Sequence, residues 1–357
     1  MSTTAVPSTM RASVLVEKGV IELQERPVPE PGDGEVLVRV ASVGVCGSDV
    51  HYYKEGRIGD FVVEQPLVLG HEVSGQVVAV GRGVPGARVG ERVAIDPQVP
   101  CRRCRACKSG RMNLCPNMVF YATPPVDGTF CDYVTAPSDM AYVVPDAMSD
   151  DAAALLEPFS VGLWAAHKAG TTPGDRVLVA GAGPIGAMVA QAVRARGAAD
   201  VVVTDFVDSR RERITSFGAT RALHPVEDAD EIAALGADAF VDCSGATPAV
   251  QSGLRALRPG GAAVLVGLGA DEMALPVTFI ASREITVTGV FRYVDTWPRG
   301  IALFTSGAVH LDEMVTARYP LEQVEDALNA DSDPLSMKAV VVVNPTERVE
   351  PTGQEDA

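Results

Sequence analysis

The sequence predicts an α/β protein with an all-β part and a part built on a parallel sheet. Its 357 residues exceed the size, about 250–300 residues, at which a single hydrophobic core stops growing. Short valine-rich runs broken by glycine and proline fill residues 11–100, whereas strand-like and helix-like runs alternate from residue 173 onward. The first pattern is typical of a β-barrel, and the second of a doubly wound parallel sheet with crossover helices.

The expected elements follow from these runs. In the β-rich part, strands are expected at residues 11–19, 35–46, 73–81 and 91–97, in a closed or barrel-like sheet that protects its edges. In the alternating part, strands are expected at 176–183, 200–206, 238–245, 262–269 and 284–291, with helices at 185–197, 210–219 and 248–261. Helices at 301–307 and 321–330 and a strand at 337–344 do not extend this repeat and are expected to return to the first domain, before a frayed acidic tail.

Composition excludes several classes of protein. The chain is 47% hydrophobic and 21% charged, which is typical of a folded globular protein. Its net charge of −16 repels nucleic-acid phosphates and anionic lipid, so neither partner is expected. The N-terminus lacks a basic segment followed by an apolar one, and the longest uncharged stretch, 177–193, contains Gly-Ala-Gly-Pro-Ile-Gly rather than a membrane span. A cytoplasmic location is expected.

Four of the seven cysteines form the pattern C-x2-C-x2-C-x7-C, at Cys101, Cys104, Cys107 and Cys115. Four thiolates at such spacing can surround one tetrahedral zinc ion and leave no position for substrate, so this zinc would be structural. An iron–sulfur cluster and four unrelated cysteines are the alternatives. Nearby arginines either offset the thiolate charge or form a solvated face; they are Arg102, Arg103, Arg105 and Arg111.

Cys46, His71 and Glu72 form a second candidate metal site. A thiolate, an imidazole and a carboxylate would hold Zn²⁺ at zero net charge with a fourth position open for water or an alcohol oxygen. Because long stretches of chain separate Cys46 from His71, these residues could equally be ordinary core residues. Glu157 is by itself only a carboxylate at the start of a helix.

Gly181-Ala-Gly183-Pro-Ile-Gly186 follows a predicted strand and opens a predicted helix. Glycines in this pattern allow a tight turn and the close approach of a dinucleotide pyrophosphate. Asp205, at the end of the next strand, can accept both ribose hydroxyls and repels a 2′-phosphate, which favours NAD over NADP. Arg210 and the adjacent Arg211 could bind a phosphate, or could lie on a solvated helix face.

Together these motifs resemble the zinc-dependent medium-chain dehydrogenases, and specifically their polyol branch. The resemblance extends over nearly the whole chain and rests on residues 46–51, 53–61, 70–84, 121–130, 157–162, 266–269 and 289–298. It implies a GroES-like catalytic domain at residues 1–160 and 300–357, with an inserted Rossmann domain at 161–299. It further implies a homotetramer with one catalytic and one structural zinc per chain.

The resemblance also implies roles for individual residues. Glu157 would bond the water at the catalytic zinc or become a fourth ligand, and charge balance favours the water. Ser48, Glu157 and His51 are candidates for a proton relay, although a polar surface position suits His51 better. The substrate pocket would be lined by Ser48, Tyr52, Phe120, Thr123, Arg292 and Tyr293. The NAD contacts would include Ile185, Arg210, Val266, Gly267, Leu268, Val290, Phe291 and Arg292.

The reaction implied is NAD-linked oxidation of a secondary alcohol in a polyol such as sorbitol, xylitol or L-iditol, at C2, to the ketose. A polyhydroxylated chain needs polar side chains at its far end, which Arg292 and Tyr293 would provide. Two alternatives remain open at this point: another zinc dehydrogenase of the threonine or butanediol type, and a non-catalytic NAD-binding module.

Overall fold

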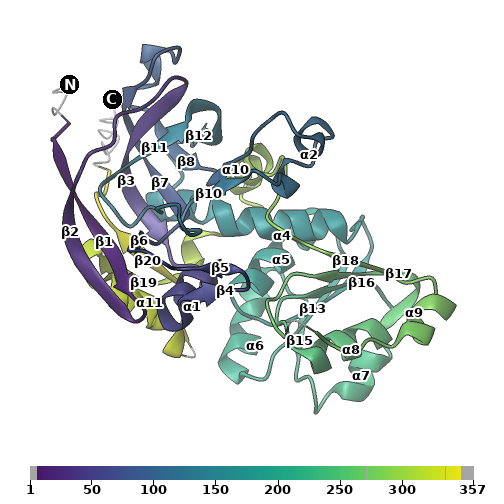
Figure 1. Ribbon diagram of the computed structural model, residues 1–357. Coiled ribbons are helices and arrows are strands. Elements are labelled where there is room, and N and C mark those ends of the chain that lie inside the picture. Colours follow the sequence, from purple (N-terminus) through teal and green to yellow (C-terminus); the bar gives the residue numbers. More distant parts are fainter. Residues whose placement is uncertain (1–5, 271, 334, 347–357) are drawn as a thin grey trace, which may run out of the picture.

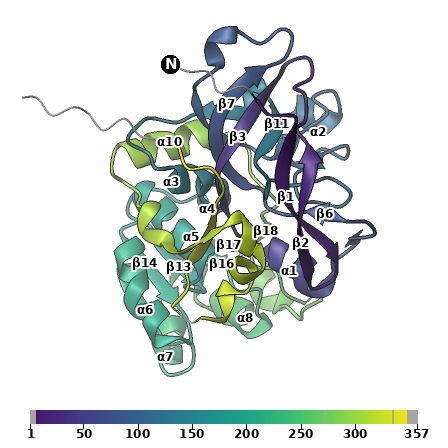
Figure 2. The same cartoon turned by 90° about the vertical axis from the view of Figure 1, so that its left-hand side faces the viewer.

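The structure is a computed structural model that describes residues 6–270, 272–333 and 335–346. Most of the predicted acidic tail lies outside these residues. A β-rich part and a part with a parallel sheet lie on either side of helix α4 (Leu156–Lys168) (Figure 1). The view turned by 90° places the β-rich part above and the parallel sheet below (Figure 2). This arrangement confirms the predicted fold class.

The β-rich part is built on a seven-stranded sheet with the path β12-β8-β7-β3-β20-β19, and β11 also pairs with β3. Its strands are β3 (Glu35–Gly44), β7 (Glu72–Val80), β8 (Arg92–Ile95), β11 (Tyr133–Pro137), β12 (Ala141–Val143), β19 (Val315–Pro320) and β20 (Lys338–Val342). A three-stranded sheet of β1 (Thr9–Glu17), β2 (Val20–Pro27) and β6 (Leu67–Val68) lies beside it. Two short hairpins complete this part: β4 (Arg57–Ile58) with β5 (Phe61–Val62), and β9 (Gln98–Val99) with β10 (Val119–Phe120).

The late strands β19 and β20 belong to the first sheet, because β20 runs antiparallel to the end of β3 and parallel to β19. The sequence predicted β20 but missed β19, whose alternating half-buried pattern suits an edge strand. The predicted domain boundaries at 160/161 and 299/300 fall inside α4 and α10 (Trp297–Thr305).

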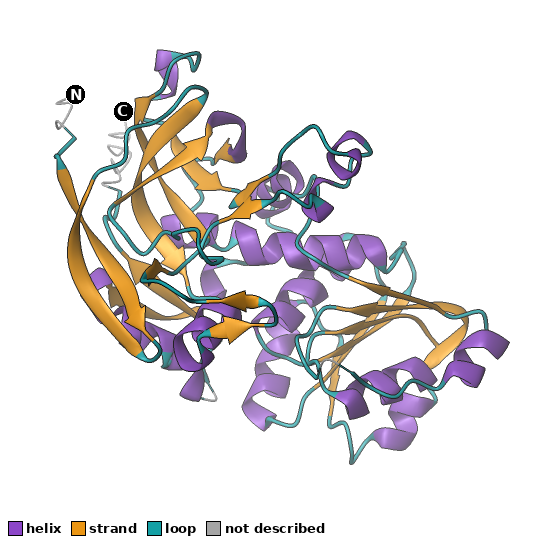
Figure 3. Cartoon of the chain, viewed as in Figure 1, coloured by secondary structure: helices purple, strands orange, loops and turns teal. Residues whose placement is uncertain are grey.

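The second part has a six-stranded parallel sheet in the order β15-β14-β13-β16-β17-β18, with helices on both faces (Figure 3). Along β13, Val177 and Val179 face α4 and α5 (Pro184–Ala195), whereas Leu178 and Ala180 face α7 (Ala229–Ala233) and α8 (Thr247–Arg255). Its strands are β13 (Arg176–Ala180), β14 (Asp200–Thr204), β15 (Arg221–Leu223), β16 (Ala237–Asp242), β17 (Leu257–Leu265) and β18 (Thr286–Gly289). The predicted helix at 248–261 is too long: α8 ends at Arg255 and β17 begins at Leu257, because Pro259 and Gly260 do not continue a helix.

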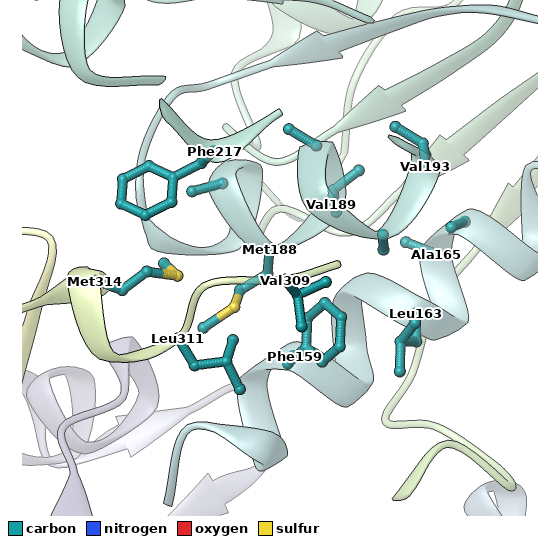
Figure 4. Packing of buried hydrophobic residues seen from close by; sticks show 14 of the residues in the cluster. Phe159, Leu163, Ala165, Met188, Val189, Val193, Phe217, Val309, Leu311 and Met314 are labelled. Carbon is teal, nitrogen blue, oxygen red and sulfur yellow. The ribbon is translucent and has the colours of Figure 1, made fainter. Parts of the chain in front are cut away.

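Helix α4 joins the two parts through a continuous apolar core. Phe159 and Leu163 of α4 pack toward Met188 of α5 (Figure 4). Leu311 and Met314, which lie between α10 and β19, close the cluster on the other side. A side chain at Gly162 would meet the Met188 backbone at 2.8 Å, so this glycine sets how closely the two helices approach. The remaining helices are α1 (Gly47–Glu55), α2 (Arg105–Lys108), α3 (Asp150–Ala154), α5 (Pro184–Ala195), α6 (Asp208–Ile214), α7 (Ala229–Ala233), α8 (Thr247–Arg255), α9 (Val277–Ser282) and α11 (Val324–Leu328).

Among the described residues, no helix combines the length and the apolar character that crossing a membrane requires.

Candidate active site and metal centres

Cys46, His71 and Glu72, which we call the open site, meet at one end of the large sheet. Their ligand atoms all lie within 4.8 Å of one another. Cys46 is the N-cap of α1, soon after β3, and Glu72 begins β7. Gly44 of β3 pairs with Glu72, so the antiparallel ladder brings these distant segments together.

Asp49, which is fully buried, holds the two segments of the open site in register. Its carboxylate accepts hydrogen bonds from the backbone N–H of Cys46 at 3.1 Å and of Gly70 at 2.9 Å. One of its oxygens also lies 3.7 Å from Nδ1 of His71. A carboxylate in this place fixes the ring orientation of a histidine ligand.

Glu72 is held between a glycine and a buried lysine. A side chain at Gly44 would lie 2.0 Å from Oε2 of Glu72, so only glycine leaves room for this carboxylate. Lys338, at the start of β20, donates to Oε1 of Glu72 at 2.5 Å and to the carbonyl of Val45 at 2.6 Å. Oε2 of Glu72 is buried and has no protein partner.

The open site therefore fits zinc by its chemistry. A thiolate, an imidazole and a carboxylate are the donors that catalytic zinc takes, with a further position left for water or substrate. The unpartnered Oε2 of Glu72 is an acceptor that a bound cation would satisfy.

Glu157 lies on α4 and is buried. Burial is the main cause that raises its pKa to about 7, with a further increase from nearby Glu72 and opposing effects from His71, Tyr293 and Lys338. The hydroxyl of Tyr293 donates to Oε1 of Glu157 at 3.0 Å. Tyr293 itself has no solvent exposure. It therefore supports Glu157 from the protein interior and cannot line a substrate pocket.

A polar and aromatic cluster lies beside His71. The Phe120 ring lies 5.4 Å from the His71 ring, and the Arg292 guanidinium lies 4.5 Å above Phe120. Burial raises the pKa of Tyr52, while a hydrogen bond with Thr123 opposes this rise. The structure thus brings together Tyr52, Phe120, Thr123 and Arg292. Ser48 lies half-buried in the first turn of α1, and His51 is exposed and pairs with Glu55 at 3.3 Å.

The four cysteines at residues 101–115, which we call the cysteine lobe, also converge within 4.8 Å. Sγ of Cys104 accepts from the N–H of Cys107 at 3.5 Å, and backbone donors at Arg103 and Cys104 lower the pKa of Cys101 to about 6. All four are free cysteines, as a closed structural zinc shell requires. Of the nearby arginines, Arg102 pairs with Asp139 instead of lying alone beside the thiolates.

The glycine-rich turn has the geometry of a dinucleotide site. Gly181 has a φ of 98°, and a side chain at Gly186 would lie 1.9 Å from the Gly181 carbonyl. Gly183 caps α5 without a side chain, which leaves the helix N-terminus open to an anion. The Asp205 carboxylate accepts from the backbone N–H groups of Ala182 and Val207 at 2.8 and 2.9 Å, and stays fixed beside the turn.

A cleft of about 440 Å³ connects the open site to the region of the glycine-rich turn. Cys46 and Glu72 line one side, and Ile185 and Arg210 line the other. Nε of Arg210 is buried without a partner, whereas Arg211 is bound to the Asp205 carbonyl. Other predicted NAD contacts follow strand ends of the parallel sheet: Val266, Gly267 and Leu268 after β17, and Val290 and Phe291 after β18. Leu268 and Phe291 are exposed, at 70% and 52%.

Sequence reasoning missed Lys338, the space at Gly44 and the role of Asp49. A lysine opening the buried run Lys338–Val342 was the available signal, because an unpaired buried lysine is rare.

This fold and these two ligand sets define a zinc-dependent dehydrogenase with a dinucleotide-binding domain. Residues 32–146 match the alcohol dehydrogenase GroES-like domain, and residues 184–306 match the zinc-binding dehydrogenase domain. The chain belongs to this family, which confirms the predicted resemblance.

Among its relatives, the sorbitol dehydrogenase of Bacillus subtilis is 44% identical over 91% of this chain and 94% of that protein. The structure of L-idonate 5-dehydrogenase from Escherichia coli is 31% identical, with a TM-score of 0.88, and covers 94% of this chain and 98% of its own. An Escherichia coli alcohol dehydrogenase solved with NADH is 28% identical, with a TM-score of 0.88 over 94% of this chain and 100% of its own.

Proposed function

We propose that the protein oxidises a secondary alcohol of a polyol to the ketose, reversibly, with zinc and NAD. Sorbitol, xylitol and L-iditol, reacting at C2, are the candidate substrates. The observation that carries the proposal is the polar cluster of Tyr52, Thr123 and Arg292 beside His71. Such a cluster suits a substrate with hydroxyl groups along its length. The sorbitol dehydrogenase relative supports the same substrate class.

Cys46, His71 and Glu72 would hold the catalytic zinc, and the glycine-rich turn with Asp205 would hold NAD. When bound, zinc acidifies the alcohol and NAD accepts the hydride from its carbon. Asp205 favours the NAD ribose over a 2′-phosphate. Arg210 lines the coenzyme side of the cleft, and the exposed Leu268 and Phe291 would add further NAD contacts.

Glu157 accepts the proton that the alcohol releases, through a water molecule and with Ser48 as a relay. Burial raises the pKa of Glu157 to about 7, which suits a group that takes and returns protons near neutral pH. Tyr293 holds the carboxylate through its 3.0 Å hydrogen bond. His51 is exposed at the rim of the cleft and is a candidate for passing protons to solvent.

The decisive experiment measures kcat/KM for sorbitol and for 2-propanol in the wild type and in Arg292→Ala. We expect sorbitol to be the far better substrate, and we expect the variant to lose about 100-fold or more on sorbitol with little change on 2-propanol. A site built to hydrogen-bond hydroxyls leaves its polar groups unpaired with a simple alcohol. An equal proportional loss on both substrates, or a raised KM for NAD alone, would contradict the role of Arg292.

The same assay on threonine and 2,3-butanediol separates the alternatives. Faster turnover of either one would identify another zinc dehydrogenase, and no NADH formation on any alcohol would indicate a non-catalytic module.

The resemblance further suggests a homotetramer in the cytoplasm. The seven free cysteines are consistent with a reducing compartment. Light scattering on the purified protein tests the subunit count.

A further inference from the structure

The backbone around Arg292 adopts a conformation that needs support. Arg292 has a φ of 55°, and nearby Asp295 has a φ of 53°. Left-handed geometry is unfavourable for a residue other than glycine, and such residues persist only where their surroundings hold them. Residues 291–293, which we call the anchor segment, therefore depend on external contacts.

Two buried amide side chains hold the anchor segment on either side of Arg292. Nδ2 of Asn113 donates to the carbonyl of Phe291 at 2.8 Å, and Nε2 of Gln98 donates to the carbonyl of Tyr293 at 3.3 Å. Asn113 is 4% exposed and Gln98 is fully buried. The carbonyls of the two residues that flank Arg292 thus each accept a hydrogen bond from outside the segment.

These amides come from the cysteine lobe and from the hairpin that borders it. Asn113 lies between Cys107 and Cys115, so the fold of the lobe sets its position. Gln98 lies on β9 and pairs with Phe120 of β10. Phe120 is the ring over which the Arg292 guanidinium lies. The backbone and the side chain of Arg292 are therefore held by one connected unit.

We propose that Asn113 and Gln98 are positioning residues for Arg292, and that the cysteine lobe sets the affinity for polyol through Asn113. The assignment rests on the proposed function, because it takes Arg292 as the group that binds the distal hydroxyls. The lobe thereby has a task in substrate binding in addition to its own stability. Both amides are buried and neither lines the cleft, so the effect falls on substrate binding and leaves the hydride transfer step unchanged.

The first test compares steady-state kinetics of the wild type with Asn113→Asp, which keeps the shape but places an acceptor against the Phe291 carbonyl. We expect the KM for sorbitol to rise about tenfold, with kcat and the KM for 2-propanol within twofold of the wild type. Lys108→Ala, an exposed change in the same lobe, should leave all values unchanged. An unchanged KM for sorbitol in Asn113→Asp would overturn the assignment.

A second variant, Gln98→Met, removes the other amide at similar volume and guards against failure of the first to fold. We expect the same direction of change in the KM for sorbitol. Loss of turnover on 2-propanol together with sorbitol, in both variants, would show a general structural role and overturn the proposal.

Native-state trypsin cleavage after Arg292, followed by mass spectrometry, tests positioning without any substrate. Because Tyr293 is fully buried, cleavage at this bond requires the anchor segment to open. We expect Asn113→Asp to accelerate this cleavage several-fold relative to cleavage after Arg92, which lies in β8. Equal acceleration at both bonds would refute local positioning. If the wild type fails to oxidise sorbitol, the proposed function fails, while the cleavage ratio still decides whether Asn113 holds the segment.

Discussion

The cysteine lobe and the open site hold their metals in different ways. All four ligands of the lobe lie within residues 101–115, in one excursion of the chain. The open site takes its ligands from the start of α1 and the start of β7, and its supporting lysine from β20. The lobe is thus a local structure, whereas the open site is a product of the whole sheet.

This difference separates stability from chemistry. When four thiolates of one loop bind a zinc ion, the free energy of metal binding stabilises the folded form of that loop. The open site is supported by paired strands whether or not a metal is bound, and Lys338 gives Glu72 a partner in its absence. Loss of metal should therefore unfold the cysteine lobe, whereas loss of metal from the open site should abolish activity and leave the fold intact.

The largest expected effect is that of His71→Ala on turnover. Loss of one ligand of the open site should lower kcat/KM for sorbitol at least about 1,000-fold, because metal polarisation of the alcohol supplies several kcal/mol of the barrier reduction. The melting temperature should change little, since the strands β3 and β7 remain paired. Kinetics and thermal melts on the same preparation check this, and a large drop in melting temperature would erase the contrast between the two sites.

Lys338→Met tests the support beneath the open site. Removal of one partner of a buried ion pair costs about 3–5 kcal/mol, and here the cost falls on the metal-free protein, in which Glu72 loses its cation. We expect the melting temperature to rise more on adding zinc in the variant than in the wild type. Lys338→Arg, which keeps the charge, is the control. Equal rises in Lys338→Met and the wild type would show that Lys338 does not stabilise the metal-free site.

Cys104→Ser should produce the opposite pattern to His71→Ala. Breaking the closed shell should remove one zinc per chain and lower the melting temperature by roughly 5–10 °C, while kcat on 2-propanol stays near that of the wild type.

Metal analysis during mild chelation adds a second check, because the open site should release its zinc first and lose activity before the fold is lost. If the purified active protein contains fewer than two zinc ions per chain, the assignment of two zinc sites is wrong.

The last prediction concerns Asp96, a buried carboxylate beside Gln98. Burial raises its pKa to about 7 from 3.8, against opposing hydrogen bonds from Gln98. The folded state therefore keeps a proton on Asp96 that the unfolded chain releases. As pH rises from about 4 to 7, the contribution of Asp96 to the free energy of unfolding falls, by at most about 1.4 kcal/mol per pH unit.

Asp96→Asn removes this dependence. The unfolding free energy of the variant minus that of the wild type should rise between pH 5 and 7 and level off above pH 7. Chemical denaturation at several pH values measures this difference, in which the metal contributions common to both proteins cancel. A difference that does not vary with pH would show that Asp96 is ionised in the fold throughout this range.

Local sequence patterns were sufficient to predict the fold class, the dinucleotide turn and the cysteine lobe. Each depends on local spacing: alternating strands and helices, three glycines around a helix start, and four thiols in one loop. For the open site, the residue types left a metal site and ordinary core residues equally open, because nothing local brings Cys46 near His71. The family resemblance decided between the two.

The contacts that cross the sheets could be seen only in the folded structure. Pairing of β20 with β3 buries Lys338 against Glu72, and the packing of the cysteine lobe brings Asn113 to the Phe291 carbonyl. Tyr293, expected at the substrate, is fully buried and donates its hydroxyl to Glu157. Such contacts join residues far apart in the chain, and they depend on strand register and side-chain packing, which no local sequence pattern encodes.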